Sequence, residues 1–162
     1  MEHFHVRVAS DRLAFSAAHF ITFGKDQCER LHGHNYRVAA EVSGPLDENH
    51  YVVDFVALES LLREIVGRLD HRVMLPAEHP GLEVSEQECE VTVRLGRRRW
   101  VFPRDDCVIL PVANTTTELL ARHIGQLLIQ SLRGRCGLSP GAVRVELEEG
   151  LGQVAVWRSQ GL

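Results

Sequence analysis

Three histidines near the start of the chain, His19, His32 and His34, have the spacing of a metal-binding site. His32 and His34 are two residues apart, so their side chains point to the same side if this segment is a β-strand. His19 ends an earlier apolar segment that could pair with that strand. Three neutral imidazoles are the ligand set of a catalytic zinc ion that keeps a fourth position open. A His-x-His pair alone is a weak signal, because two surface or core histidines give the same pattern, but the addition of His19 favours a metal.

Cys28 lies four residues before His32, in the segment 28–36 with the sequence CERLHGHNY. An isolated cysteine is more often a small buried apolar residue than a reactive one. Its place in a loop beside the candidate zinc ligands instead supports a thiolate that takes a proton from a substrate. The other cysteines are expected only to pack or to lie at the surface: Cys89, Cys107 and Cys136.

The composition is that of an ordinary globular chain of 162 residues, 44% of them hydrophobic and 25% charged, and predicts a single domain spanning 1–162. The net charge of −4 argues against a general binder of nucleic acid or membrane surfaces, which needs an excess of Lys and Arg. No apolar run approaches the roughly 20 residues that a membrane-spanning helix requires. Four dispersed cysteines, without a CxxC pair or a signal-peptide pattern before them, predict a soluble cytoplasmic protein.

Apolar alternation predicts strands at both ends of the chain. Residues 3–20 alternate, but the phase slips across 10–12, which indicates a β-bulge within a long first strand that ends near His19. The segment 34–43 is predicted to be the second strand. The two closing strands are expected at 143–147 and 154–157.

Two helices are predicted between these strands. Asp54 is the expected N-cap of the first, which should end at Asp70-His71. The segment 115–118 (TTTE) matches a capping box that opens the second, which should run to about Arg133. Strands at both ends with helices between them predict an α+β fold, in which an antiparallel sheet carries helices on one face.

The segment from about 76 to 111 differs from its surroundings. Residues 91–95 alternate before a turn at 96–98, and residues 100–102 return, so the segment is expected to be an insertion that carries a hairpin.

The chain contains a series of sequence blocks that cover nearly all of it apart from 76–111. They are 15–19 (FSAAH), Cys28 with 31–36 (LHGHNY), 53–55 (VDF), 69–71 (LDH), 116–118 (TTE) and 148–149 (EE). In type and order these blocks resemble the family of 6-pyruvoyl-tetrahydropterin and 6-carboxytetrahydropterin synthases. The resemblance implies a tunnelling fold with a four-stranded antiparallel sheet and two helices per subunit. It also implies a homo-oligomer, either a trimeric barrel or a dimer of such trimers, with active sites between subunits.

The reaction implied by the resemblance is that of a zinc-dependent lyase acting on 7,8-dihydroneopterin triphosphate. Zinc on His19, His32 and His34 would bind the side-chain hydroxyls of this pterin, and Cys28 would take a proton. The gap of three residues between Cys28 and His32 is more similar to bacterial 6-carboxytetrahydropterin synthases than to the animal pyruvoyl enzymes. We therefore expect loss of triphosphate and acetaldehyde, for a pathway such as queuosine-type deazapurine, biopterin or folate synthesis.

Asp70 and His71 match a family pair that relays protons to or from the substrate side chain, across a subunit interface. An aspartate bonded to an imidazole sets the tautomer of the ring and raises its basicity. The alternative is structural, a histidine favoured at a helix C-terminus by the helix dipole.

Three glutamates are candidates for substrate binding. A pterin ring presents an amidine-like edge of N–H donors, which one carboxylate can accept in bidentate fashion. Counting back from Trp157 and keeping the apolar alternation of 143–147 places Glu149 on the inward face and selects it. An alignment to the family by local similarity allows Glu148 instead. Either could be an exposed acid at a strand end. Glu118 is a third candidate, and serves equally well as the acidic half of the capping box.

Two alternatives in function stay open at this point. One is a 6-pyruvoyl-tetrahydropterin synthase or a related pterin enzyme, and the other is a non-catalytic assembly that binds a pterin or a metal. The arginines at 97–99 are most simply a solvated turn, although they could also reach the substrate triphosphate.

Overall fold

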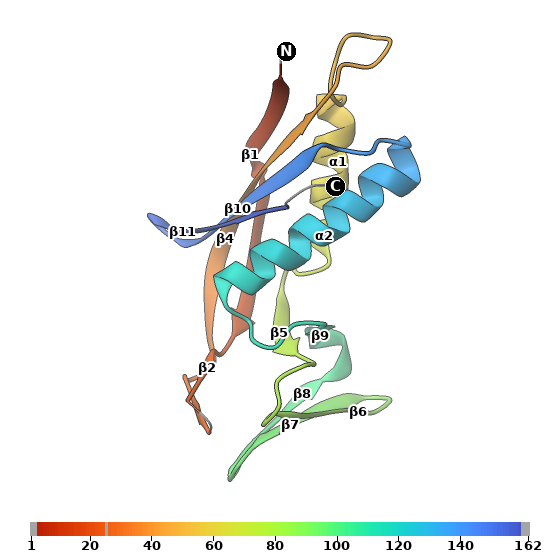
Figure 1. The fold of residues 1–162 in the computed structure, drawn as a ribbon. Coiled ribbons are helices and arrows are strands. Elements are labelled where there is room, and N and C mark those ends of the chain that lie inside the picture. Colours follow the sequence, from red (N-terminus) through yellow and green to blue (C-terminus); the bar gives the residue numbers. More distant parts are fainter. Residues whose placement is uncertain (1–2, 25, 160–162) are drawn as a thin grey trace.

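The structure, a computed structural model, describes residues 3–24 and 26–159 and is built on a curved sheet with helices on one side (Figure 1). The sheet has six strands in the order β11-β10-β4-β1-β5-β9. The strands are β1 (Phe4–His19), β2 (Thr22–Phe23), β3 (Gln27–Cys28), β4 (His32–Gly44), β5 (Arg72–Pro76), β6 (Glu83–Glu86), β7 (Glu90–Leu95), β8 (Arg98–Pro103), β9 (Cys107–Leu110), β10 (Ala142–Gly150) and β11 (Gln153–Arg158). The helices are α1 (Phe55–Gly67), the short 3-10 helix η1 (Arg104–Asp106) and α2 (Thr117–Cys136). Neither α-helix, within the described residues, combines the length and the apolar character needed to cross a membrane.

A bulge in β1 decides which side chains face the helices. β1 pairs antiparallel with β4, and the register shifts between Ala9 and Ala14, as the phase slip predicted. Val8 is buried before the shift, and Leu13, Phe15 and Ala17 are buried after it. The inward parity therefore changes from even to odd residue numbers, because extra residues in one strand turn the following side chains to the other face.

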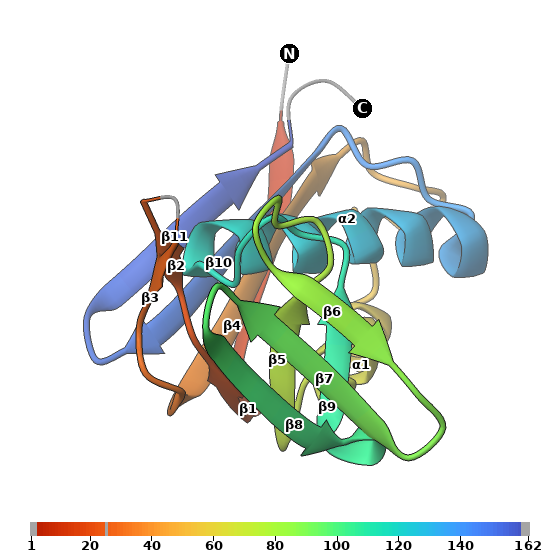
Figure 2. The same ribbon diagram turned by 90° about the horizontal axis from the view of Figure 1, so that it is seen from below.

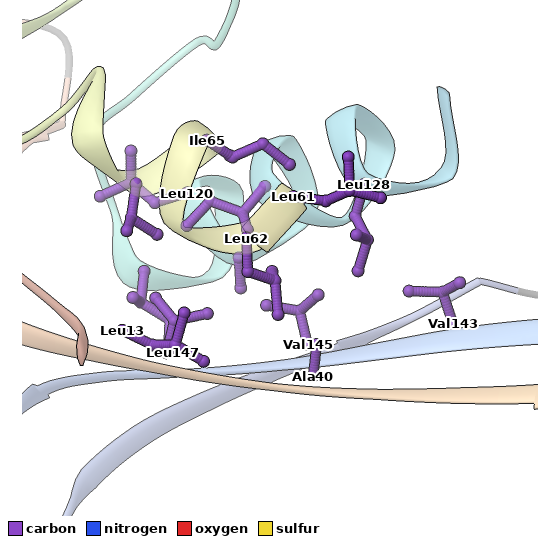
Figure 3. Close-up of a cluster of buried hydrophobic side chains, with 14 of the residues drawn as sticks. Leu13, Ala40, Leu61, Leu62, Ile65, Leu120, Leu128, Val143, Val145 and Leu147 are labelled. Carbon is purple, nitrogen blue, oxygen red and sulfur yellow. The ribbon is translucent and has the colours of Figure 1, made fainter. Parts of the chain in front are cut away.

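Both helices pack on the same face of the sheet, and their apolar sides meet the inward side chains of the strands (Figure 3). Asp54 is the N-cap of α1, as predicted, and its carboxylate accepts a hydrogen bond from Ala57 N at 2.8 Å. Two predicted helix ends were wrong. α1 ends at Gly67, before Asp70-His71, and α2 continues beyond Arg133 to Cys136, where Gly137 takes the left-handed backbone with φ of 63°.

The sheet is larger than the predicted four-stranded antiparallel one. The pairs β1–β4, β4–β10 and β10–β11 are antiparallel, whereas β5 pairs in parallel with β1 and β9 pairs in parallel with β5. The sheet is therefore mixed. The parallel pairing of β5 is possible because α1 carries the chain back before β5 begins.

The segment between β5 and β9 forms a second small sheet that lies beyond one end of the main sheet (Figure 1) and faces the viewer when the molecule is seen from below (Figure 2). The expected hairpin is present as β7 and β8, and β6 adds a third strand on the far side of β7. This second sheet has its own apolar cluster, which includes Phe20 of the main body, and Trp100 of β8 stacks on Phe20 with ring centroids 4.8 Å apart. The segment is therefore packed against the residue that follows His19.

Two glycines of α2 form a matched pair for testing the helix-to-sheet packing. A Cβ at Gly125 would overlap the ring of Trp157 on β11, whereas a Cβ at Gly134 would meet nothing within 4 Å. Alanine has a helix propensity up to about 1 kcal/mol better than glycine, and overpacking typically costs about 1–3 kcal/mol. We expect Gly134→Ala to raise the free energy of unfolding and Gly125→Ala to lower it, as measured by urea denaturation. Equal effects of the two substitutions would contradict the close approach of Trp157.

Candidate functional site

The three histidines meet at the end of the β1–β4 pair. His19 lies opposite His32 in the register, and His34 lies opposite Ala17, so all three project from the face that the bulge selects. One nitrogen of each ring lies within 4.8 Å of the others. His19 is buried, while His32 and His34 are half-buried. The cluster can therefore hold a metal ion and still be reached from solvent on one side.

Two of the rings are oriented by backbone carbonyls. His19 Nδ1 donates to Thr115 O at 2.9 Å, and His32 Nδ1 donates to Arg30 O at 2.8 Å. A proton fixed on Nδ1 leaves Nε2 with a free electron pair, which is the state of an imidazole that binds a metal. Burial lowers the pKa of His19, and this favours the neutral ring that metal binding requires.

The segment before α2 holds His19 in place. Thr115 is buried, and its hydroxyl donates to Phe20 O at 3.1 Å while its carbonyl accepts from His19. The side chain of Asn114 bonds both backbone groups of Thr22, at 3.2 and 2.9 Å. The predicted capping box does not form, because the N-cap is Thr116 and Glu118 is an exposed residue of the first turn. Sequence reasoning missed the role of Thr115, which lies 96 positions from its histidine.

Glu149 is the glutamate that reaches the histidines. Its Oε1 lies 3.3 Å from His19 Nε2 and 4.0 Å from His34 Nε2, and it accepts a hydrogen bond of 3.1 Å from the Tyr36 hydroxyl. Glu148 turns away and accepts from Gly152 N at 2.9 Å, in the turn between β10 and β11. The strand parity that favoured Glu149 over Glu148 thus agrees with the geometry.

Tyr36 holds the Glu149 carboxylate in place through its hydroxyl hydrogen bond. Its ring is buried and stacks on Phe15 with centroids 4.8 Å apart. Burial, and then the neighbouring Glu149 charge, raise the pKa of Tyr36. The hydroxyl therefore stays protonated and remains a donor. Local periodicity could not reveal this bond, because the two partners lie 113 positions apart in the sequence.

Glu29 lies beside the histidine cluster, in the loop that follows the short β3 and its residue Cys28. Cys28 is half-buried, pairs with Thr22, and is not one of the groups within the histidine cluster. The Arg98 guanidinium donates to Cys28 Sγ at 2.7 Å. The Glu29 carboxylate lies 3.8 Å from His32 Nε2, with 43% of the side chain exposed. Glu29 was missed in the sequence, although an acid three residues before a candidate ligand is a usable signal.

Asp70 and His71 are locked to the edge of β1 but lie outside the histidine cluster. Asp70 Oδ1 accepts from Ser16 N at 2.8 Å, and His71 N donates to Ser16 O at 2.7 Å. Asp70 Oδ2 lies 3.0 Å from His71 Nδ1, and the His71 side chain is 82% exposed. His71 also has a left-handed backbone with φ of 57°. Hydrogen bonds to Ser16 therefore fix the position of the pair, and the His71 imidazole is exposed to solvent.

The chain is similar to proteins described as pterin synthases. A family model described as 6-pyruvoyl tetrahydropterin synthase matches residues 9–160. A putative 6-carboxy-5,6,7,8-tetrahydropterin synthase of Methanocaldococcus jannaschii is 29% identical over 147 residues, which are 90% of each chain. A protein of the same description from Pyrococcus horikoshii is 34% identical over 118 residues, which are 72% of this chain and 70% of that protein.

The fold is also similar to solved structures. The 6-pyruvoyltetrahydropterin synthase of Plasmodium vivax superposes with a TM-score of 0.89 at 29% identity and covers 99% of both chains. Two further structures of that protein, with the same TM-score, are of variants in which one glutamate is replaced. This glutamate is described as a catalytic residue, and the replacement is alanine in one variant and cysteine in the other.

The anchoring of Asp70 to β1 predicts a pH-dependent stability. The hydrogen bond from Ser16 N, and then the contact with His71, lower the pKa of Asp70 below its usual range. Between the folded pKa and the usual value of about 3.9, the unfolded chain therefore binds more protons than the folded chain. The stability that Asp70 contributes is fully present above the usual value and is lost as the pH falls through the folded pKa.

We expect Asp70→Asn to lower the free energy of unfolding at pH 7 by about 1 kcal/mol or less, because the side chain is partly exposed. The difference from wild type should shrink below about pH 4, as measured by urea denaturation across pH. Asp11→Asn, on the exposed bulge, is the control and should show no such trend. A difference for Asp70→Asn that stayed constant down to pH 2 would count against the anchoring role.

Proposed function

The chain belongs to the 6-pyruvoyl tetrahydropterin synthase family, and from this premise we propose that it is a zinc-dependent lyase. Its substrates are 7,8-dihydroneopterin triphosphate and one molecule of water, and its products are 6-carboxy-5,6,7,8-tetrahydropterin, triphosphate and acetaldehyde. The observation that carries the proposal is the cluster of three histidines with Glu149 beside it. The names of the relatives from Methanocaldococcus and Pyrococcus support the carboxy product.

Zinc fits the donor set of the cluster. The ligands are three imidazoles without a carboxylate or thiolate among them, and His19 and His32 have their Nδ1 protons committed to carbonyls. Zinc with three histidines and one open position supplies Lewis-acid activation of the substrate's hydroxyl groups when it is bound. Glu149, fixed by Tyr36, then accepts N–H donors from the pterin ring.

Proton transfer is assigned to two groups on different sides of the site. Cys28 takes a proton from the substrate side chain as a thiolate. His71, with Asp70 behind it, exchanges protons on the opposite side. The outward presentation of His71 supports a site shared between subunits of a homo-oligomer, a trimer or a dimer of trimers, in which this imidazole serves a neighbouring histidine cluster.

A second candidate function is a 6-pyruvoyl-type synthase. The similarity to the Plasmodium vivax enzyme favours it, because that enzyme has a glutamate described as catalytic and Glu29 of this chain lies 3.8 Å from a candidate zinc ligand. This chain therefore has two candidate bases in adjacent positions, Cys28 and Glu29.

The products of one incubation separate the candidate functions. Zinc-loaded protein given 7,8-dihydroneopterin triphosphate should release triphosphate and acetaldehyde and form a pterin with the mass of the 6-carboxy compound. Chelation should stop the reaction, and zinc should restore it, because the metal polarises the substrate hydroxyls. A pyruvoyl-type pterin with no acetaldehyde would assign the second function. Bound zinc and pterin without any product would indicate the non-catalytic assembly.

Matched variants assign the base. Cys28→Ala should reduce turnover by about 100-fold or more, the usual contribution of a positioned proton acceptor, while zinc content measured by elemental analysis stays unchanged. Glu29→Gln should have the smaller effect if the carboxy reaction is correct. Cys136→Ala, at the exposed end of α2, is the control. Full turnover of Cys28→Ala together with loss of turnover in Glu29→Gln would move the role of base to Glu29.

A further inference from the structure

Arg98, on the second small sheet, reaches back to the loop that carries the candidate base. Its Nη1 atom donates to Cys28 Sγ at 2.7 Å and to Cys28 O at 3.0 Å, and it lies 3.4 Å from Glu29 O. These contacts span 70 positions of the sequence. One guanidinium thus binds both the thiol and the backbone of the residue expected to move a proton.

The second sheet holds Arg98 in this position. The guanidinium lies over the ring of Trp100, with its carbon 5.9 Å from the ring centroid, and a cation over an indole face is attracted to it. Trp100 in turn stacks on Phe20. Cys28 itself packs against the apolar cluster of the second sheet. The path from β8 to Cys28 is therefore one of direct contacts.

We propose that Arg98 is a positioning residue, which orients Cys28 and stabilises its thiolate, so that the second sheet is part of the catalytic apparatus. The proposal rests on the role of Cys28 in the proposed function. A cation beside a cysteine favours the thiolate over the thiol. Arginine suits this task because its guanidinium stays charged and its Nη1 carries two N–H donors in a planar group, whereas lysine offers a flexible point charge.

The other charges around Cys28 do not supply this cation. Its described chain neighbours with charge are Asp26, Glu29 and Arg30, all exposed, and the paired strand presents the uncharged Thr22. In the described chain, Arg98 is the charged residue from another element that the structure records within hydrogen-bond distance of the thiol. The earlier interpretation of Arg98 as part of a solvated turn is therefore incomplete.

Binding of the substrate triphosphate is the competing role for this arginine. Arg98 lines a surface pocket together with Arg30 and Arg99, so an anion is a reasonable ligand of this region. The two roles differ in the free enzyme. A phosphate-binding arginine affects Cys28 only through the substrate, whereas a positioning arginine affects Cys28 without it.

The test is the reactivity of Cys28 in the substrate-free, zinc-loaded protein. Alkylation by iodoacetamide is followed at each cysteine by peptide mass spectrometry from pH 5 to 9, with the exposed Cys89 and Cys136 as internal references. In Arg98→Ala we expect Cys28 to react about tenfold more slowly at pH 7, because a thiol that loses its cation is ionised less. The reactivity of the two reference cysteines should not change.

Two further variants separate positioning from folding. Arg98→Lys should restore part of the Cys28 reactivity, since it returns the charge but not the planar guanidinium. Arg97→Ala in the adjacent exposed turn should behave as wild type. Unchanged profiles of Cys28 in both Arg98→Ala and Arg98→Lys would overturn the proposal. If Arg98→Ala does not fold, the comparison of Arg98→Lys with wild type decides in the same way.

Turnover measurements complete the distinction. Positioning predicts that Arg98→Ala lowers kcat and leaves KM nearly unchanged, whereas phosphate binding predicts a raised KM with normal alkylation of Cys28, which would overturn the proposal. The alkylation result does not depend on which pterin is formed. If the proposed substrate is wrong, the alkylation result for Arg98 is still valid. If the proposed role of Arg98 is wrong, the product assay of the wild-type protein is still valid.

Discussion

The site depends on one buried hydrogen bond, from His19 Nδ1 to the carbonyl of Thr115. This bond joins the end of β1 to the segment that opens α2, and the Thr115 hydroxyl adds a second link to Phe20 O. A buried imidazole without a partner for its N–H would be costly. The bond therefore orients His19, and it also requires the start of α2 to lie where it does.

The β1 bulge supplies the other condition for the site. By changing the inward parity before Leu13, it places the second half of β1 in register with His32 and His34 on the helix side of the sheet. The same face continues into the apolar core beneath the helices, so the histidines stand at the edge of a rigid, packed layer. A metal cluster benefits from such support, because small displacements of its ligands weaken binding.

The second sheet contacts two segments that carry residues of the candidate site. It is joined to the main body through the stack of Trp100 on Phe20, next to His19 in the sequence, and through Arg98 on Cys28. These contacts place β8 against both the residue after a candidate ligand and the candidate base. Asp70 and His71, in contrast, are anchored at the edge of β1 and face outward. Of the two proposed proton-transfer groups, Cys28 is therefore bonded to the second sheet, whereas the His71 imidazole lies at the surface.

The sequence by itself determined the features that depend on residues close together in the chain. The bulge, the Asp54 cap, the parity of His32 and His34 and the preference for Glu149 all follow from local periodicity or local hydrogen bonding. The roles of Thr115, Tyr36 and Arg98 were decided only by the tertiary structure, because their partners lie 96, 113 and 70 positions away. The parallel pairing of β5 and β9 escaped prediction for the same reason. Short apolar segments carry no local signal of the strand beside which they will lie, and the packing of the whole sheet decides it.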